Sequence, residues 1–285
     1  MITFPADDGT SLVRHREGAA TETDGTPLVC LPGGPFQDSR YLGDLGGLAA
    51  RHPFVRLDLR GSGASGVPAD RPGSYRCDRL VGDVEALRTD TGAAAVDLLG
   101  HSAGANLAVL YAARHPERVR RLVLVTPGTA AVGLDTAPEE RLAAARLRAG
   151  EPWFAEAYAA LEEVTAGRGT AESFGKVAPF FHGTWDEAAR ERHAASQRER
   201  NGEAAAGYAA EGAFDPPATR AALAAFPGPV LVVAGEGDAN TPPPTAAAYA
   251  GLFPRARLEV LKGGGHFPWH DDAEWFAGTV ADFLR

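Results

Sequence analysis

The stretch GHSAGA contains a serine whose setting suits nucleophilic chemistry. Ser102 lies between Gly100 and Gly104 in the pattern G-x-S-x-G, after the apolar run AVDLL and before the helix-like run ANLAVLYAARH. A serine on a sharp strand-to-helix turn keeps its hydroxyl exposed, and the glycines are needed because a Cβ would collide with the neighbouring chain. In such a turn the N–H of the next residue, Ala103, points at a developing oxyanion. The pentapeptide alone is a weak signal, so a base and an acid must be sought elsewhere.

Two later apolar runs each end in a loop that carries one of these groups. PVLVVA leads into Asp238 in GEGD, and RLEVL leads into His266 in GGGH. A serine needs a base to take its proton, and the base needs a carboxylate to hold its tautomer. Loops that follow parallel strands gather at one edge of a sheet, so these side chains are expected to converge. We therefore predict Ser102 as nucleophile, His266 as base and Asp238 as acid.

Other residues compete for these roles. His270 is the alternative base, although a surface position is expected for it. Glu236 and Asp135 are the alternative acids. His101 adjoins the nucleophile, and we expect it to pack or to form a supporting hydrogen bond rather than to act as base.

A second oxyanion donor is expected in the glycine-rich loop PGGPF. Glycines let a backbone approach a substrate oxygen closely, which makes the N–H of Gly34 the candidate donor and places Phe36 at the pocket floor. A further glycine-rich stretch, DLRGSGAS, lacks the Lys-Ser/Thr ending of a phosphate loop. We predict for it a structural turn held by Asp58 and Arg60.

The elements that must position these residues alternate between strand and helix. Apolar runs without polar alternation are typical of strands covered on both faces of a parallel sheet. Such runs are residues 27–31, 54–59, 95–99, 122–126, 229–234 and 257–261. Helical patterns occupy residues 78–88, 105–114, about 245–252 and about 273–284. Residues 11–16 are expected to add an antiparallel edge, and the whole predicts an α/β fold with a doubly wound sheet.

This alternation stops between residues 130 and 226. The stretch is rich in Ala, Glu and Arg, has no convincing strand, and is expected to form a helical insertion within a core of residues 1–129 and 227–285. Aromatic residues in the insertion indicate a substrate with apolar bulk. The expected substrate contacts are Phe36, His101, Phe180, Phe181 and Trp185.

Composition narrows the function further. The chain has 285 residues, of which 45% are hydrophobic and 23% charged, as in a globular protein with a large core. A net charge of −9 with no basic stripe argues against nucleic-acid binding. The N-terminus lacks a signal-peptide pattern, no apolar run approaches the ~20 residues of a membrane span, and two cysteines are too few for a disulfide framework. We expect a cytoplasmic protein with a small-molecule substrate and no metal or cofactor, and the oligomeric state stays open.

The motifs LPGGPF, DLRGSGAS, GHSAGA, GEGD and GGGHFPW together resemble the α/β-hydrolase superfamily, in order over nearly the whole chain. The resemblance implies the α/β-hydrolase fold, with a mostly parallel eight-stranded sheet, flanking helices and a helical cap after the sixth strand. PGGP with DLRGSGAS is similar to the proline iminopeptidase-like branch, which usually shows HGGPG and DQRGSG. This chain departs from that branch at Pro32, Phe36 and Ala103, where the branch usually has histidine, glycine and tryptophan.

These patterns predict a serine hydrolase that cleaves a small carboxylic ester, thioester or lactone through an acyl-enzyme. One alternative is a proline iminopeptidase-like aminopeptidase, whose cap would supply glutamates; Glu199, Glu203 and Glu211 lie in the corresponding region but receive no role. Another is a ligand-binding protein without catalysis on the same fold. Cofactor-free halide oxidation or C–C bond hydrolysis with the same three residues is also compatible with the sequence.

Overall fold

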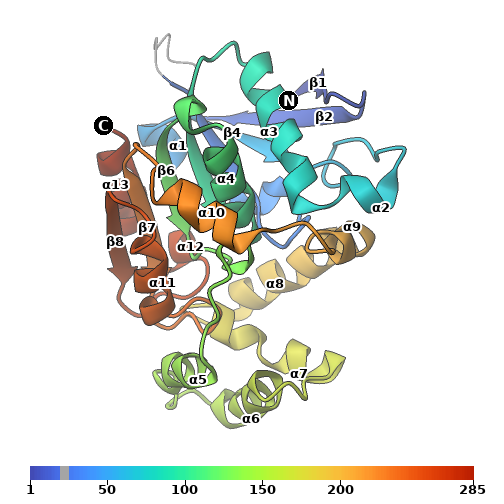
Figure 1. Ribbon diagram of the computed structural model, residues 1–285. Helices are drawn as coiled ribbons and strands as arrows, with labels where there is room; N and C mark the ends of the chain where they lie inside the picture. Colours follow the sequence, from blue (N-terminus) through green and yellow to red (C-terminus); the bar gives the residue numbers. More distant parts are fainter. Residues whose placement is uncertain (20–25) are drawn as a thin grey trace.

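A single eight-stranded sheet runs through the centre of the molecule (Figure 1). The computed structural model describes residues 1–19 and 26–285. The strand order is β1-β2-β4-β3-β5-β6-β7-β8, with β1 and β2 antiparallel to their neighbours and all pairs from β4 to β8 parallel. The strands are β1 (Ile2–Pro5), β2 (Ser11–Glu17), β3 (Leu28–Leu31), β4 (Phe54–Asp58), β5 (Val96–His101), β6 (Val119–Val125), β7 (Val230–Gly235) and β8 (Ala256–Leu261). The predicted mostly parallel eight-stranded sheet is confirmed.

The central strands are apolar on both faces because helices cover both. In β5, Leu98 packs into one hydrophobic cluster and Leu99 into the other, and both side chains are fully buried. Leu122 and Val123 divide between the same two clusters in β6. Successive strand residues point to opposite faces, so a strand covered on both sides must be apolar throughout.

Helices of the core form a layer on each side of the sheet. One layer contains α3 (Cys77–Asp90), α4 (Ala103–Arg114), α10 (Pro216–Leu223) and α11 (Pro243–Ala250). The other contains α1 (Leu48–Arg51), α12 (Pro268–Asp271) and α13 (Ala273–Leu284). A short helix, α2 (Arg71–Ser74), precedes α3. The four longer helical patterns read from the sequence correspond to α3, α4, α11 and α13.

Between β6 and β7 the chain forms helices only. They are η3 (Ala130–Val132), α5 (Pro138–Arg146), α6 (Phe154–Thr165), α7 (Ala171–Lys176), η4 (Ala178–Phe181), α8 (Glu187–Glu199), α9 (Gly202–Gly207) and α10. Figure 1 shows α5, α6 and α7 grouped at one end of the molecule, away from the sheet, whereas α10 lies against α4 of the core. Leu161, Val177 and Phe180 form the centre of a separate apolar cluster in this group, which Ala239 of the core joins.

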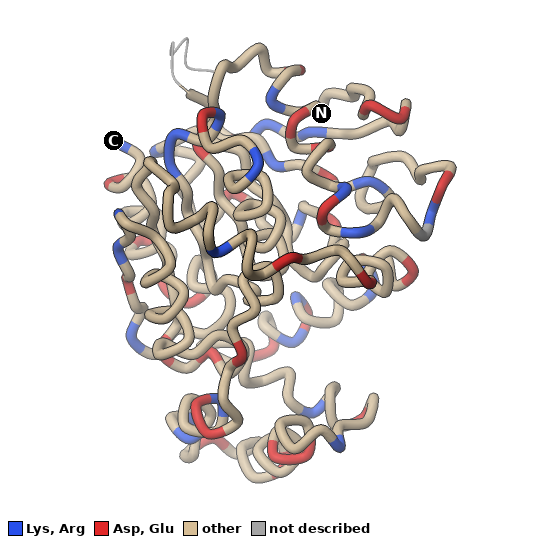
Figure 2. Tube along the Cα trace, viewed as in Figure 1, with Lys and Arg blue, Asp and Glu red and all other residues tan. Residues whose placement is uncertain are grey.

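Charged residues of both signs are interspersed along the described chain (Figure 2). None of the helices within residues 1–19 and 26–285 combines the length and the apolar character that crossing a membrane would demand.

Candidate active site

Ser102 occupies a strained turn at the carboxyl end of β5. Its φ of 52° and ψ of −119° lie outside the regions that L-residues favour, and α4 begins at the next residue. A methyl group on Gly100 would lie 2.6 Å from the carbonyl oxygen of Gly104, and one on Gly104 would lie 2.6 Å from the carbonyl oxygen of Pro32. The two glycines are therefore required by close backbone packing, as the G-x-S-x-G pattern predicts.

His266 and Asp238 form a buried pair at the same edge of the sheet. His266 Nδ1 lies 2.8 Å from Asp238 Oδ2, and Asp238 has no exposed surface. The other carboxylate oxygen, Oδ1, accepts the N–H of Asn240 over 2.8 Å, which fixes the orientation of the carboxylate. Of the alternative acids, Glu236 accepts a backbone N–H in an exposed loop and Asp135 is exposed. The imidazole therefore contacts Asp238 and neither alternative.

His101 links three parts of the site. Its Nε2 lies 2.9 Å from the carbonyl oxygen of His266, and its Nδ1 lies 2.7 Å from the hydroxyl of Tyr41, which accepts the N–H of Gly33 over 2.7 Å. Burial, with a smaller effect from the nearby His266, holds the pKa of His101 well below its usual value, so the ring is neutral. A neutral ring must donate from Nε2, since a carbonyl only accepts, and Nδ1 then accepts from Tyr41.

Thr126 is a further supporting residue, which the sequence analysis did not single out. It follows β6 with a φ of 41°, which is unusual for a β-branched residue, and it is fully buried. Its hydroxyl donates over 2.9 Å to the carbonyl of His266, the same oxygen that His101 contacts. Its place as the polar residue closing the apolar run LVLVT is the signal that could have found it.

Two backbone N–H groups beside Ser102 lack internal partners. Gly33 packs directly on Ser102, since a methyl group placed on it would lie 2.9 Å from Ser102 Cβ. Its own N–H is taken by Tyr41, but the N–H groups of Gly34 and Ala103 have no hydrogen-bond acceptor within the part of the chain that the structure describes. Ala103 is the first residue of α4, where N–H groups have no partner inside the helix.

The backbone of residues 181–183, at the end of η4, contacts the loop that carries His266, which we call the histidine loop. The N–H of His266 donates to the carbonyl of Phe181 over 2.8 Å. The Asp271 carboxylate accepts the N–H of Gly183 over 3.0 Å and that of Gly265 over 2.7 Å. A methyl group on Gly265 would lie 2.7 Å from the backbone nitrogen of Gly183, so the two segments pack backbone to backbone.

Two cavities each have a residue of this segment in their lining. The first, which we call the aromatic cavity, has a volume of about 400 Å³ and lies between α5, α6, α7, η4 and the loop after Asp238. Phe180 and Phe181 line it, and the Phe181 ring also packs on His266 with its centroid 5.9 Å away. The second, about 310 Å³, contains the His182 side chain and is described further below.

The remaining predicted substrate contacts lie elsewhere. Phe36 is fully buried, with its ring edge-on to Tyr75 and Tyr208, and is not among the residues that line the two cavities. Both ring nitrogens of His101 are engaged within the protein. Trp185 packs against His182 and His193 and also lines neither cavity. Of the five predicted contacts, Phe180 and Phe181 are therefore the two that face one of these spaces.

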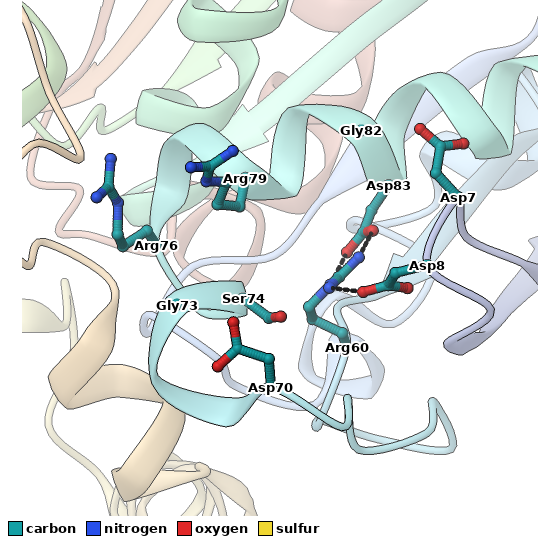
Figure 3. Close-up of a pocket in the computed structure, with 10 residues that line it drawn as sticks. All are labelled: Asp7, Asp8, Arg60, Asp70, Gly73, Ser74, Arg76, Arg79, Gly82 and Asp83. Carbon is teal, nitrogen blue, oxygen red and sulfur yellow. Dashed lines mark hydrogen bonds and ion pairs between the residues drawn. The ribbon is translucent and has the colours of Figure 1, made fainter.

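A third cavity, larger than these two at about 500 Å³, has none of Ser102, Asp238 and His266 in its lining and is shown in Figure 3. At its centre Arg60 binds both oxygens of Asp83, at 2.8 and 2.5 Å, and contacts Asp8 at 2.6 Å. Asp58 accepts the N–H of Ala64 across the same DLRGSGAS turn over 2.9 Å. The prediction of a structural turn held by Asp58 and Arg60 is confirmed.

Comparison with known proteins places this geometry in a family. Residues 26–273 match the model of a protein family that is described as "alpha/beta hydrolase fold". A 2-hydroxymuconate semialdehyde hydrolase from Pseudomonas sp. (strain CF600) is 32% identical over 248 residues, which is 83% of this chain and 78% of the relative. The chain therefore belongs to the α/β-hydrolase family, as the sequence motifs indicated, and it is a hydrolase.

Solved structures agree with this fold. An esterase from Exiguobacterium antarcticum superposes with a TM-score of 0.73 at 19% identity, covering 99% of this chain and 98% of its own. Proline iminopeptidase from Mycobacterium smegmatis gives a TM-score of 0.73 at 24% identity, covering 99% of this chain and 97% of its own. At these identities the likeness concerns the fold.

Proposed function

We propose that the protein is a serine hydrolase that cleaves a carboxylic ester, thioester or lactone of a small, partly apolar substrate through an acyl-enzyme. The observation that carries this proposal is the buried His266–Asp238 pair, in which Nδ1 lies 2.8 Å from Oδ2. The strained Ser102 turn is near it, since the ring of His101, the preceding residue, lies 5.0 Å from the ring of His266. A buried imidazole with a fixed carboxylate partner is the arrangement that activates a serine hydroxyl.

In the proposed mechanism, Ser102 Oγ attacks the substrate carbonyl while His266 Nε2 takes its proton. Asp238 holds the imidazole tautomer through Nδ1 and stabilises the positive charge that forms. The free N–H groups of Gly34 and Ala103 donate to the oxyanion. His266 then returns the proton to the leaving group. Water, activated by the same imidazole, hydrolyses the acyl-enzyme and regenerates the serine.

The aromatic cavity is proposed to receive the apolar part of the substrate. Its wall is mainly aliphatic and aromatic and includes Leu161, Val164, Val177, Phe180 and Phe181. Its volume of about 400 Å³ lies within the range of small-molecule pockets. Because the Phe181 ring packs on His266, a group in this cavity lies beside the proposed base.

The cap glutamates give little support to an aminopeptidase. Such an enzyme needs free carboxylates for the substrate ammonium group. Glu203 lies 3.6 Å from Arg71 on the surface, Glu199 lies 3.9 Å from Arg40, and Glu211 is exposed. The ester-type substrate class is therefore the better supported proposal.

A fluorophosphonate probe tests the proposed chemistry. We expect stoichiometric labelling of the wild-type protein and no labelling of Ser102→Ala. A panel of 4-nitrophenyl acyl esters and aminoacyl 4-nitroanilides then tests the substrate class, with turnover expected for the esters. Absence of labelling in the folded wild-type protein would refute the serine hydrolase, and faster turnover of the anilides would favour the aminopeptidase.

A further inference from the structure

The second cavity beside the site differs from the aromatic cavity in its lining. We call it the histidine cavity, with a volume of about 310 Å³. Its wall includes His182, His193 and His270, and the rings of Tyr41 and Phe267 form part of its apolar surface. It is therefore a mixed space, with polar and cationic groups set against aromatic walls.

Two buried polar atoms in this wall have no partner. Within the described residues, neither Gln37 Nε2 nor His182 Nε2 makes a hydrogen bond, although each side chain belongs to a residue that is only 5% exposed. Buried polar groups are nearly always paired, because an unpaired one costs about 1–3 kcal/mol. A ligand in the cavity can supply the missing partner of both atoms, which lie in residues of one wall.

The charges around the cavity favour a negative ligand. Arg192, an exposed residue of α8, lines it, and none of the ion pairs among the residues described here includes Arg192. The one acidic residue in the lining, Glu199, lies 3.9 Å from Arg40, which also binds Asp38 at 2.6 Å. The nearby Asp271 carboxylate is engaged by two backbone N–H groups.

The polar groups of the wall can act as donors to such a ligand. The amide of Gln37 supplies an N–H, and a neutral imidazole at His182 can supply another. Burial, together with smaller effects from His193 and Arg192, lowers the pKa of His182 to about 3, so this ring is neutral at pH 7. A guanidinium group with nearby N–H donors matches the two oxygens of a carboxylate.

The cavity adjoins the proposed reaction centre. The Phe267 ring lies on His182, with the rings stacked at a centroid distance of 5.2 Å, and lies 5.4 Å from the ring of His266. Gln37 lies beside the oxyanion loop, since a methyl group on Gly34 would lie 2.8 Å from Gln37 Cβ. This wall is therefore close to the proposed base and to the loop of the proposed oxyanion donor Gly34.

We infer that the histidine cavity binds a carboxylate of the substrate through Arg192, Gln37 and His182. This inference rests on the proposed serine hydrolase function and narrows its substrate class. The preferred substrates are esters, thioesters or lactones that carry a second, free carboxylate a few atoms from the carbonyl under attack.

A matched pair of esters tests the inference. Mono-4-nitrophenyl glutarate carries the free carboxylate, and its methyl ester lacks the charge. We expect the wild-type protein to have the higher kcat/KM for the free acid. Arg192→Gln should lower that preference by about tenfold, mainly through KM, because a charge-assisted contact is worth roughly 1.4 kcal/mol. Gln37→Leu should act in the same direction.

Arg190→Gln is the matched control, because Arg190 lies on the same helix over the Trp185 ring and does not line the cavity. It should leave the preference unchanged. Equal wild-type kcat/KM values for the two esters, or an equal effect of Arg192→Gln on both, would overturn the inference.

Binding without turnover separates this inference from the proposed function. Calorimetry of glutarate with Ser102→Ala protein is expected to show binding that the additional Arg192→Gln change weakens. Glutarate binding of this kind, together with a wild-type protein that neither reacts with the probe nor turns over esters, would refute the hydrolase but support the carboxylate cavity. Probe labelling and ester turnover without any glutarate binding would refute the cavity alone.

Discussion

The Nε2 atom of His101 donates a hydrogen bond over 2.9 Å to the backbone carbonyl of His266. The residue before the nucleophile therefore holds the loop that carries the proposed base. Because the His101 ring is neutral, its other nitrogen accepts from Tyr41, which in turn accepts from Gly33. One chain of three hydrogen bonds thus connects the loop at Gly33, the end of β5 and the loop that carries His266.

Tyr41→Phe breaks this chain at its centre. The change leaves the Gly33 N–H and the His101 Nδ1 without their partner, and each unpaired buried group costs about 1–3 kcal/mol. We expect a lower free energy of unfolding in urea and a fall in kcat larger than the change in KM, since the oxyanion loop loses its anchor. Tyr158→Phe is the control, because the buried Tyr158 hydroxyl has no partner among the described residues. Equal effects of the two changes would contradict this role for Tyr41.

Asp238→Asn tests the acid. An amide in place of the carboxylate favours the wrong imidazole tautomer at His266, and the analogous change in a serine protease lowers kcat by about 10⁴-fold. We expect a loss of this order in kcat for a 4-nitrophenyl ester, with the fold retained by circular dichroism. Glu236→Gln should have little effect, since Glu236 contacts the exposed loop at Gly263. A large loss in Glu236→Gln with an active Asp238→Asn would show that the wrong acid was chosen.

The buried His182 makes stability depend on pH. Its pKa is about 3 in the folded protein and near 6.5 when unfolded, so the unfolded chain binds the proton first as the pH falls. Above about pH 6.5 His182 is neutral in both states and the free energy of unfolding is unaffected. Below that pH, proton binding by the unfolded chain lowers the free energy of unfolding progressively, down to about pH 3. At pH 5 the loss is about 2 kcal/mol.

Urea unfolding at pH 7.5 and pH 5.0 measures this effect. The decrease in the free energy of unfolding between the two pH values should be smaller in His182→Gln than in the wild-type protein by about 2 kcal/mol. His115→Gln replaces a half-buried histidine outside this cavity and should behave as the wild type. The same decrease in all three proteins would exclude His182 as a source of the pH dependence.

Gly104→Ala tests the close packing behind the serine. The added methyl group would overlap the carbonyl oxygens of Leu31 and Pro32, which are backbone atoms and cannot rotate away. We expect a destabilisation of about 3 kcal/mol or insoluble protein. Gly82→Ala in α3 meets only a carboxylate oxygen of Asp7, at 3.8 Å, and should stabilise the helix by about 0.5–1 kcal/mol. Comparable denaturation midpoints for the two variants would contradict this packing argument.

The sequence predicted the part of the site that follows strands. Ser102 and Asp238 follow β5 and β7, which are buried throughout, and the parallel topology predicts that they and His266 lie at one edge. His266 instead follows the edge strand β8, where Arg257 and Val260 are exposed, so the expectation of a strand covered on both faces at residues 257–261 is wrong. The ends of strands were predicted less well where charged residues belong to the strand. The start of β6 at Val119 escaped the apolar pattern because Arg120 is polar, yet it pairs with the fully buried Asp97 at 2.8 Å.

The supporting residues could not be found in this way. Gln37 lies in a loop and Tyr41 in the short helix η1 (Ser39–Leu42) that follows it, and neither segment carries a motif. Their positions depend on how this part of the chain folds over Gly33 and Gly34. His182 follows η4, where no periodicity separates a cavity residue from a surface one.

The short strand β1 was missed because a four-residue run ending in proline carries too little pattern.

The junction at residues 181–183 also determines where the protein can be recombined with its relatives. The backbone of this segment bonds to His266 and to the Asp271 carboxylate, so it behaves as part of the histidine loop although it lies in the insertion. A chimera that exchanges helices upstream of residue 181 can keep this contact intact. A chimera whose crossover falls between residues 181 and 183 would separate this segment from His266 and Asp271, the residues to which its backbone bonds. Crossover points should therefore be chosen so that these backbone hydrogen bonds stay within one parent sequence, rather than at the boundary between the sheet and the inserted helices.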